Sequence, residues 1–90
     1  MIQIHFSAPF RPTVKGFRMV NAIGENIREI LENLECTYPG LRQKIFNTDG
    51  DIKKSIHIFV NSKDVRFLRG TQTQVKDGDV ILILSDVMGG

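Results

Sequence analysis

The sequence predicts an α+β fold, in which a mixed sheet of four to five strands carries one main helix on one face. Three observations predict it. Near the start, apolar and polar residues alternate, as they do in a strand with one buried face. Further on, apolar residues recur with the period of an amphipathic helix. Close to the end, five consecutive aliphatic residues indicate a strand that is buried in the middle of a sheet.

The first two strands should form an antiparallel hairpin. In the strand over Ile2–Phe6, every second residue is apolar. Pro9 and Pro12 then end the strand, because proline has no N–H to donate to a sheet. Beyond Gly16, the segment Phe17–Val20 is expected to be the partner strand.

The main helix should begin after Asn26. The Asn26 side chain can accept a hydrogen bond from a free helical N–H, and Glu29 can reach back as in a capping box. Pro39 and Gly40 then stop the helix. One apolar stripe runs along it, formed by Ile27, Ile30, Leu31 and Leu34.

Weaker patterns follow the main helix. The segment Leu41–Phe46 can form a short second helical turn. Ile56–Val60 alternates as a third strand, and Val65–Phe67 is expected to be a shorter fourth strand. The segment 70–79 should be mostly connection, with Val75 as its apolar anchor.

The last strand, Val80–Leu84, should be central, and it leads into the end of the chain. We expect a single domain over 1–90 with a flexible C-terminal tail over 86–90. Its two terminal glycines bury no apolar side chain and lose much backbone entropy on ordering. Fully extended, five residues reach roughly 17 Å at about 3.3 Å each. The carboxylate of Gly90 can therefore enter a deep site of another protein; the alternative is a tail that merely frays.

Length and composition narrow the class of protein. Ninety residues suit one small domain, with little room for an enzyme cleft. A net charge of +2, from 12 basic and 10 acidic residues, is too balanced to indicate nucleic acid by itself. No apolar run approaches the ~18 residues of a spanning helix, and the start lacks a signal segment, so we expect a cytoplasmic protein without a membrane partner.

The cysteine and the histidines are not expected to carry chemistry. Cys36 has no histidine near it in sequence to activate a thiolate, and it is expected to be a small buried hydrophobic residue. His5 and His57 lack further ligands at a known spacing, so no metal is expected. No phosphate loop or catalytic triad order occurs, so the chain itself should not be an enzyme.

One helix can cover only one face of the sheet. Alternate residues of the last strand, together with Phe59, should therefore form an exposed apolar patch on the other face, where a partner can dock. Alternatively, Phe10 or Phe46 folds over this patch.

A basic cluster lies near the predicted fourth strand. Lys63, Arg66 and Arg69 stand beside Phe67, an arrangement that can bind RNA phosphate and stack a base. The same residues suit a docking role toward an acidic partner, or they are simply solvated.

Several short motifs accompany this order of elements. The most specific are the segment Asp64–Phe67 and the spacing from Asp77 to Gly90. Together they resemble the MoaD and ThiS family of β-grasp sulfur carriers, and within it the CysO-type carriers. The likeness covers nearly the whole chain, and the residues that carry it are Phe10, Arg11, Pro12, Leu34, Tyr38, Val60, Asn61, Asp64, Val65, Arg66, Phe67, Gly70, Asp77, Gly78, Asp79, Ile83, Leu84, Gly89 and Gly90.

The resemblance implies a ubiquitin-like β-grasp fold and a cycle that partner enzymes perform on Gly90. A ubiquitin-activating-like adenylyltransferase would use ATP and magnesium to convert the carboxylate to an acyl adenylate. Sulfur would then displace AMP and leave a thiocarboxylate, while this chain binds no cofactor itself. The residues expected to contact partners are Gly89, Met88, Val87, Phe59, Arg66 and Phe67.

The sulfur acceptor differs between family types. CysO-type carriers serve a pyridoxal-phosphate cysteine synthase, MoaD-type carriers the large subunit of molybdopterin synthase, and ThiS-type carriers thiazole formation; a metalloprotease is a further candidate partner. The segment Ser85–Met88 departs from the usual small or proline residues, which leaves the acceptor open. The alternative functions are a ubiquitin-like modifier joined through Gly90 to lysines, and a small RNA-binding module.

Overall fold

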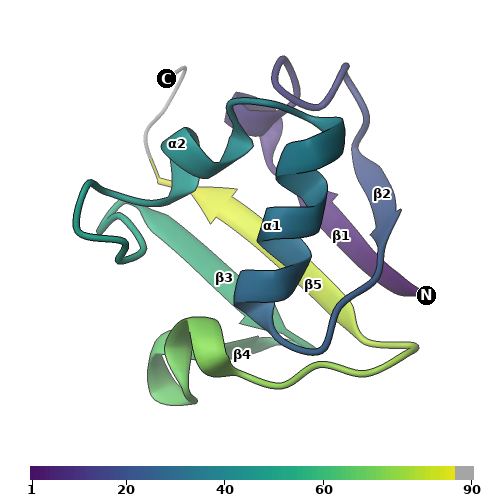
Figure 1. Cartoon of the computed structure of the whole chain (residues 1–90), viewed down its shortest axis with the longest axis vertical. Helices are drawn as coiled ribbons and strands as arrows, with labels where there is room; N and C mark the ends of the chain where they lie inside the picture. Colours follow the sequence, from purple (N-terminus) through teal and green to yellow (C-terminus); the bar gives the residue numbers. More distant parts are fainter. Residues whose placement is uncertain (87–90) are drawn as a thin grey trace.

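The computed structural model describes residues 1–86, which form a five-stranded mixed sheet with two α-helices on one face (Figure 1). The strands lie in the order β2-β1-β5-β3-β4. In chain order the elements are β1 (Ile2–Phe6), β2 (Met19–Ala22), α1 (Ile27–Thr37), α2 (Leu41–Ile45), β3 (Ile56–Val60), β4 (Lys63–Asp64) and β5 (Val80–Ser85). The predicted fold class is confirmed.

The last strand, β5, lies in the middle of the sheet, as predicted. It runs parallel to β1 and antiparallel to β3. Ile81 lies opposite Ile4 of β1, and Ile83 lies opposite Ile58 of β3. Because side chains alternate along a strand, this register turns every second residue of β5 toward the helices. The turn before the strand contains Gly78, whose φ of 92° favours glycine.

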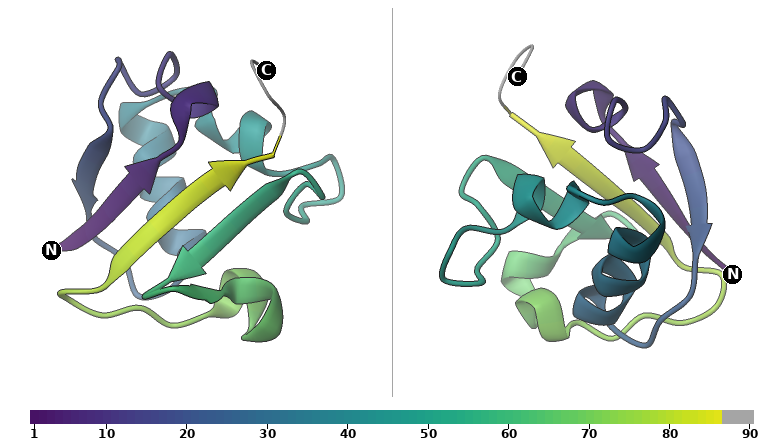
Figure 2. Two further views of the ribbon diagram at one scale, coloured as in Figure 1. Left: turned by 180° about the vertical axis from the view of Figure 1, so that it is seen from behind. Right: turned by 45° about the horizontal axis from the view of Figure 1, so that its top comes forward.

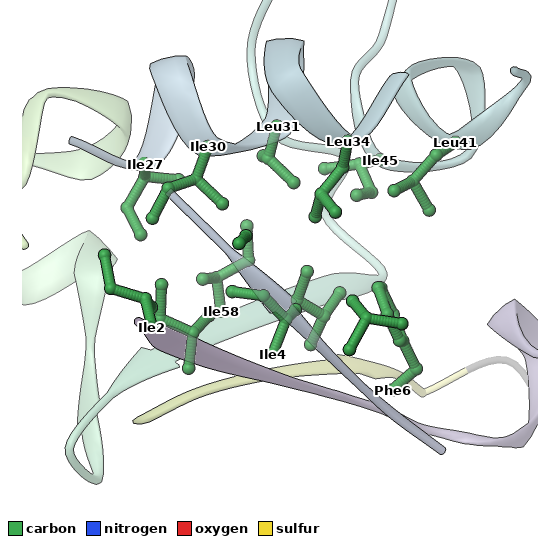
Figure 3. Packing of buried hydrophobic residues seen from close by; sticks show 14 of the residues in the cluster. Ile2, Ile4, Phe6, Ile27, Ile30, Leu31, Leu34, Leu41, Ile45 and Ile58 are labelled. Atoms are coloured by element: carbon green, nitrogen blue, oxygen red, sulfur yellow. The ribbon is translucent and has the colours of Figure 1, made fainter. Parts of the chain in front are cut away.

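The core lies between the sheet and α1 (Figure 3). The four residues of the predicted helical stripe are each at most 4% exposed, which confirms the stripe. They pack against the inward residues of the strands. Burying one such aliphatic side chain contributes about 1.5–3 kcal/mol, so these contacts hold the helix on the sheet.

The predicted start of α1 is confirmed. Asn26 Oδ1 accepts the N–H of Glu29 at 2.8 Å, and Glu29 Oε1 accepts the N–H of Glu25 at 3.2 Å, one residue before the cap. The helix ends at Thr37, before the predicted stop signal, and the predicted second helical turn is present as α2. No helix within residues 1–86 is long and apolar enough to cross a membrane.

The second strand lies two residues later than predicted. The pattern favours Phe17–Val20, whereas β2 spans Met19–Ala22 and pairs antiparallel with β1. Lys15 and Gly16 have positive φ angles of 58° and 83°, so the chain is still turning just before Phe17. The hairpin itself is confirmed, and its register places the two buried residues of β2 over the core.

The predicted fourth strand is wrong. Val65–Phe67 forms a 3₁₀ turn, and only the two residues of β4 before it pair with β3. The cause is local, because Asp64 Oδ1 accepts the N–H of Arg66 at 2.9 Å, and such a side-chain bond competes with an extended chain. The connection that follows is anchored by Val75, which is buried as predicted.

Candidate functional site

The sheet face turned away from the helices is the candidate docking surface, and we call it the outer face. Seen from behind, the strands β1, β5 and β3 lie bare on this side (Figure 2, left). Val80 and Leu82 are 40% and 36% exposed. The prediction that alternate residues of β5 point away from the core is therefore confirmed. The centre of the outer face consists of His5, Phe59, Val80, Leu82 and Leu84, with Gln3 and His57 on the same side of the sheet.

Strand register arranges the outer face in rows. Leu82 lies between His5 of β1 and Phe59 of β3, so an imidazole, an isobutyl group and a phenyl ring form one line across three strands. Together with Asn61 and Ser62, the outer face lines a shallow hollow. An apolar centre with polar groups at its margin is the composition that a protein partner recognises.

The two phenylalanines that were alternatives for covering this patch lie elsewhere. Phe10 is 2% exposed, and its ring centroid lies 6.2 Å from that of Phe6 in the core. Phe46 packs against the same core, with the Arg42 guanidinium 5.9 Å from its ring centroid. Within residues 1–86, neither phenylalanine covers the outer face.

The end of β5 is fixed to the neighbouring strand, and we call Ser85 and Asp86 the tail root. Ser85 is the last residue of β5 and lies opposite Ile56. The N–H of Asp86 donates to the carbonyl of Ser55 at 3.0 Å, and its Oδ2 lies 3.1 Å from His57 Nε2. Asp86 is thus held through both its backbone and its side chain.

Arg66 reaches the same place from the 3₁₀ turn after β4. Its Nη1 lies 2.9 Å from Nδ1 of His57, and its Nη2 donates to the carbonyls of Lys53 and Ile56 at 2.9 and 2.6 Å. Because β4 is only two residues long, the guanidinium covers the edge of β3 where no strand pairs with it.

These contacts define the tautomer of His57. Arginine only donates hydrogen bonds, so Nδ1 of His57 must be the acceptor. Nε2 then carries the proton and donates it to the Asp86 carboxylate. A neutral imidazole therefore links a fixed cation to the tail root.

The other residues predicted to contact partners fall into two groups. Phe67 is 87% exposed, and the neighbouring Leu68 is 42% exposed, so both are open to a partner. Lys63 and Arg69 are exposed as well. The remaining predicted residues, Val87, Met88, Gly89 and Gly90, lie outside the described part of the chain.

The expectation that Cys36 is a small buried residue is wrong, because its side chain is exposed. The apolar stripe of α1 ends at Leu34, and successive residues of a helix turn by about 100°, so Cys36 falls on the opposite side.

The two histidines are separate. His5 of β1 and His57 of β3 have β5 between them, and His5 Nε2 contacts Gln3 Oε1 at 3.3 Å. Within residues 1–86, no three histidine, cysteine, aspartate or glutamate side chains gather in a group that could hold a metal ion.

The contact of His57 with Asp86 has no signal in the sequence. The two residues are 29 positions apart and meet only because β3 and β5 pair in one particular register. An alternation of apolar residues predicts which face of a strand is buried, but it leaves the register with the neighbouring strand open.

The central last strand, the helix held across one face and the open opposite face define a ubiquitin-like β-grasp protein. The chain belongs to the ThiS family, whose family model matches residues 4–90. The resemblance inferred from the sequence motifs is thereby confirmed.

Similar proteins span nearly the whole chain. Sulfur carrier protein CysO of Mycobacterium tuberculosis (strain H37Rv) is 34% identical over 82 residues, which cover 89% of this chain and 88% of that protein. Small archaeal modifier protein 3 of Haloferax volcanii is 28% identical over 91 residues, which cover 99% of this chain and 98% of that protein. In the crystal structure of the BexX/CysO complex of Amycolatopsis orientalis, the matching chain has a TM-score of 0.92 and 30% identity, with 100% of both chains covered.

Proposed function

We propose that this chain is a CysO-type sulfur carrier whose reactive group is the carboxylate of Gly90. The observation that carries the proposal is the position of β5. The central strand of a rigid sheet ends at Ser85, at the margin of an open apolar face, and the family match extends to residue 90. A partner can hold the outer face and receive the residues beyond the strand.

The chemistry is a two-step activation performed by a partner. A carboxylate oxygen attacks the α-phosphorus of ATP, pyrophosphate leaves, and an acyl adenylate forms at Gly90. Hydrosulfide then forms a bond to the carbonyl carbon while the bond to the AMP oxygen breaks; AMP leaves, and loss of the sulfur proton gives a thiocarboxylate. The activating partner, a ubiquitin-activating-like adenylyltransferase, supplies ATP and magnesium in this proposal.

The described residues supply recognition in this scheme. Leu82 and Phe59 offer the apolar centre of the docking surface, and Phe67 offers a second exposed apolar group beyond β4. The residues Val87, Met88 and Gly89 would enter the partner's site with Gly90. An acyl adenylate is quickly lost to water, so a site that closes around a side-chain-free glycine end protects it.

The acceptor of the sulfur is an enzyme of biosynthesis in this proposal. A cysteine synthase is favoured, because the CysO proteins are the relatives with the higher identity over most of the chain. The large subunit of molybdopterin synthase is the second candidate. A metalloprotease would be needed if the sulfur stays attached to an amino acid at the end of the carrier.

A ubiquitin-like modifier is the second candidate function. It is favoured by the similarity to a small archaeal modifier protein over 99% of this chain. In that case the Gly90 acyl adenylate would pass its acyl group to lysine amines of other proteins, with isopeptide bonds as products.

Intact mass measurement tests the proposal. Protein purified from its native host, or incubated with the cognate activating enzyme, ATP and a sulfide source, should gain the mass of one oxygen replaced by sulfur. Deletion of Gly90 should abolish the gain and leave the thermal unfolding midpoint unchanged. Sulfur gain in the deletion variant would overturn the assignment, and a ladder of reductant-resistant conjugates that requires Gly90 would favour the modifier.

A further inference from the structure

Three side chains from three separate elements form a continuous line to the tail root. Arg66 comes from the 3₁₀ turn, His57 from β3, and Asp86 follows β5. Arg66 Nη1 lies 2.9 Å from His57 Nδ1, and His57 Nε2 lies 3.1 Å from Asp86 Oδ2. We call this arrangement the Arg66–His57–Asp86 chain.

We propose that Arg66 and His57 are positioning residues, which hold Asp86, the residue at which the chain leaves β5. The inference rests on the proposed function, because the position of Asp86 matters only if residues 87–90 enter a partner's site. It assigns to Arg66 a role within the molecule, in addition to the partner contact expected from the sequence.

The argument begins with the backbone. The N–H of Asp86 donates to Ser55 at 3.0 Å, which is one more bond along the β3 side after the last β5–β3 pair. One backbone bond still allows the chain to pivot about it. The bond from the Asp86 side chain to His57 is a second point of attachment, and the two bonds together hold Asp86 in place.

The reach of the remaining residues makes the position of Asp86 important. Four residues beyond Asp86 span at most roughly 13 Å at about 3.3 Å each. In the proposed function, a partner that holds the outer face therefore receives the carboxylate within that distance of the tail root. Misplacement by about 1 Å can cost up to a hundred-fold in rate when two reacting groups must meet.

The guanidinium of Arg66, at the far end of the Arg66–His57–Asp86 chain, is itself held by several hydrogen bonds. The Arg66 guanidinium donates to the carbonyls of Lys53 and Ile56, at 2.9 and 2.6 Å, as well as to His57. Its backbone N–H is capped by Asp64. A guanidinium with three acceptors, two in β3 and one at Lys53 just before it, cannot swing away without losing all of them, so it holds the imidazole in one orientation and one tautomer.

Substitutions at His57 separate the positioning role from simple packing. His57→Gln keeps one acceptor for Arg66 and one donor for Asp86, whereas His57→Leu keeps neither. Asp86→Ala breaks the line at its exposed end, where the side chain is 60% exposed and loss of the fold is not expected. Glu32→Gln, on the exposed surface of α1, is a control on another element.

The first measurement is nitrogen NMR of the histidine rings in the full chain. The expected result is a neutral His57 ring with the proton on Nε2 and an unprotonated Nδ1, with slow amide exchange of Asp86 that becomes faster in His57→Leu but not in His57→Gln. A proton on Nδ1 of His57 at neutral pH, or equal Asp86 exchange in all variants, would overturn the proposal.

The second measurement is the rate of sulfur gain with the cognate activating enzyme, with kcat and KM determined separately. We expect kcat to fall roughly ten-fold in His57→Leu and Asp86→Ala, and His57→Gln to recover most of the rate. A normal kcat in both deficient variants would overturn positioning. If the wild-type chain gains no sulfur, the proposed function fails instead, and the NMR result still decides whether the tail root is held.

Discussion

Leu82 of β5 and Phe59 of β3 lie directly opposite one another, and both side chains point away from the helices. Their immediate neighbours, Ile83 and Ile58, also lie opposite one another, but they are 1% exposed in the core. The same two strands thus build the core with one set of residues and an apolar surface with the next. This division allows recognition and stability to be tested separately.

Leu82→Arg should weaken binding to the activating enzyme and leave the fold intact. Leu82 is 36% exposed, so an arginine can extend into water without unfolding the sheet, but it places a charge in the apolar centre of the outer face. We expect the Kd to rise by at least ten-fold, about 1.4 kcal/mol, in a calorimetric titration. Gln43→Arg on α2 adds the same charge on the helix side and should bind normally; an equal loss in both variants would argue for a nonspecific charge effect.

Ile83→Ala should lower the stability of the fold and leave binding to the activating enzyme unchanged. The side chain is 1% exposed and lies opposite Ile58 in the core, so truncation leaves a cavity. The free energy of unfolding should fall by about 2–4 kcal/mol in a urea titration, a large part of the stability of a small domain. At temperatures where the variant is folded, its affinity for the activating enzyme should match that of the wild type.

The sequence predicts those elements in which the buried apolar residues recur at a regular spacing of a few positions. The β1 and β3 alternation, the α1 stripe and the apolar run of β5 all depend on residues a few positions apart, and the structure confirms them. The 3₁₀ turn at Val65–Phe67 was instead predicted as a strand. Its composition suits a strand, but one aspartate side chain bonds the backbone two residues on and turns the chain.

The candidate site likewise has one part that the sequence predicts and one part that it does not. The open apolar face follows from alternation along β5, which the sequence contains. The Arg66–His57–Asp86 chain does not, because its bonds join residues 9 and 29 positions apart and arise from strand register. The exposure of Cys36 was predicted wrongly, although its position outside the apolar stripe of α1 follows from helical geometry.

Gly24→Ala should destabilise the protein, because this glycine allows a close approach to α1. A Cβ at this position would lie 2.7 Å from Cγ1 of Ile30 and 3.0 Å from its backbone nitrogen. Ile30 is 1% exposed and cannot move without disturbing the core. We expect a loss of about 1–3 kcal/mol in the free energy of unfolding, measured by urea titration. Gly50→Ala is the matched control for steric crowding, because a Cβ there would meet nothing within 4 Å. Both glycines have positive φ angles. An equal loss of unfolding free energy in Gly50→Ala would therefore show that backbone strain dominates over contact with Ile30.

Glu35→Gln should lower stability in a manner that depends on pH. The Glu35 carboxylate accepts the N–H groups of Gly40 and Arg42, each at 2.9 Å, and so caps the start of α2. The Arg42 N–H, then the Gly40 N–H, lower the pKa of this carboxyl below its ordinary value of 4.5. Because the pKa is lower in the folded than in the unfolded state, the stabilisation is fully present above about 4.5 and is lost as the pH falls through the folded value.

The measurement is the thermal unfolding midpoint of both proteins between neutral pH and pH 3. The wild type should melt higher than Glu35→Gln at neutral pH, and the difference should shrink in acid as the wild-type carboxyl takes up a proton. Glu32→Gln, on the exposed face of the same helix, removes an equal charge without touching the turn into α2, and its midpoint should stay close to that of the wild type at neutral pH. A difference at Glu35 that stays constant down to pH 3 would show that the side chain acts through its shape and not through its charge.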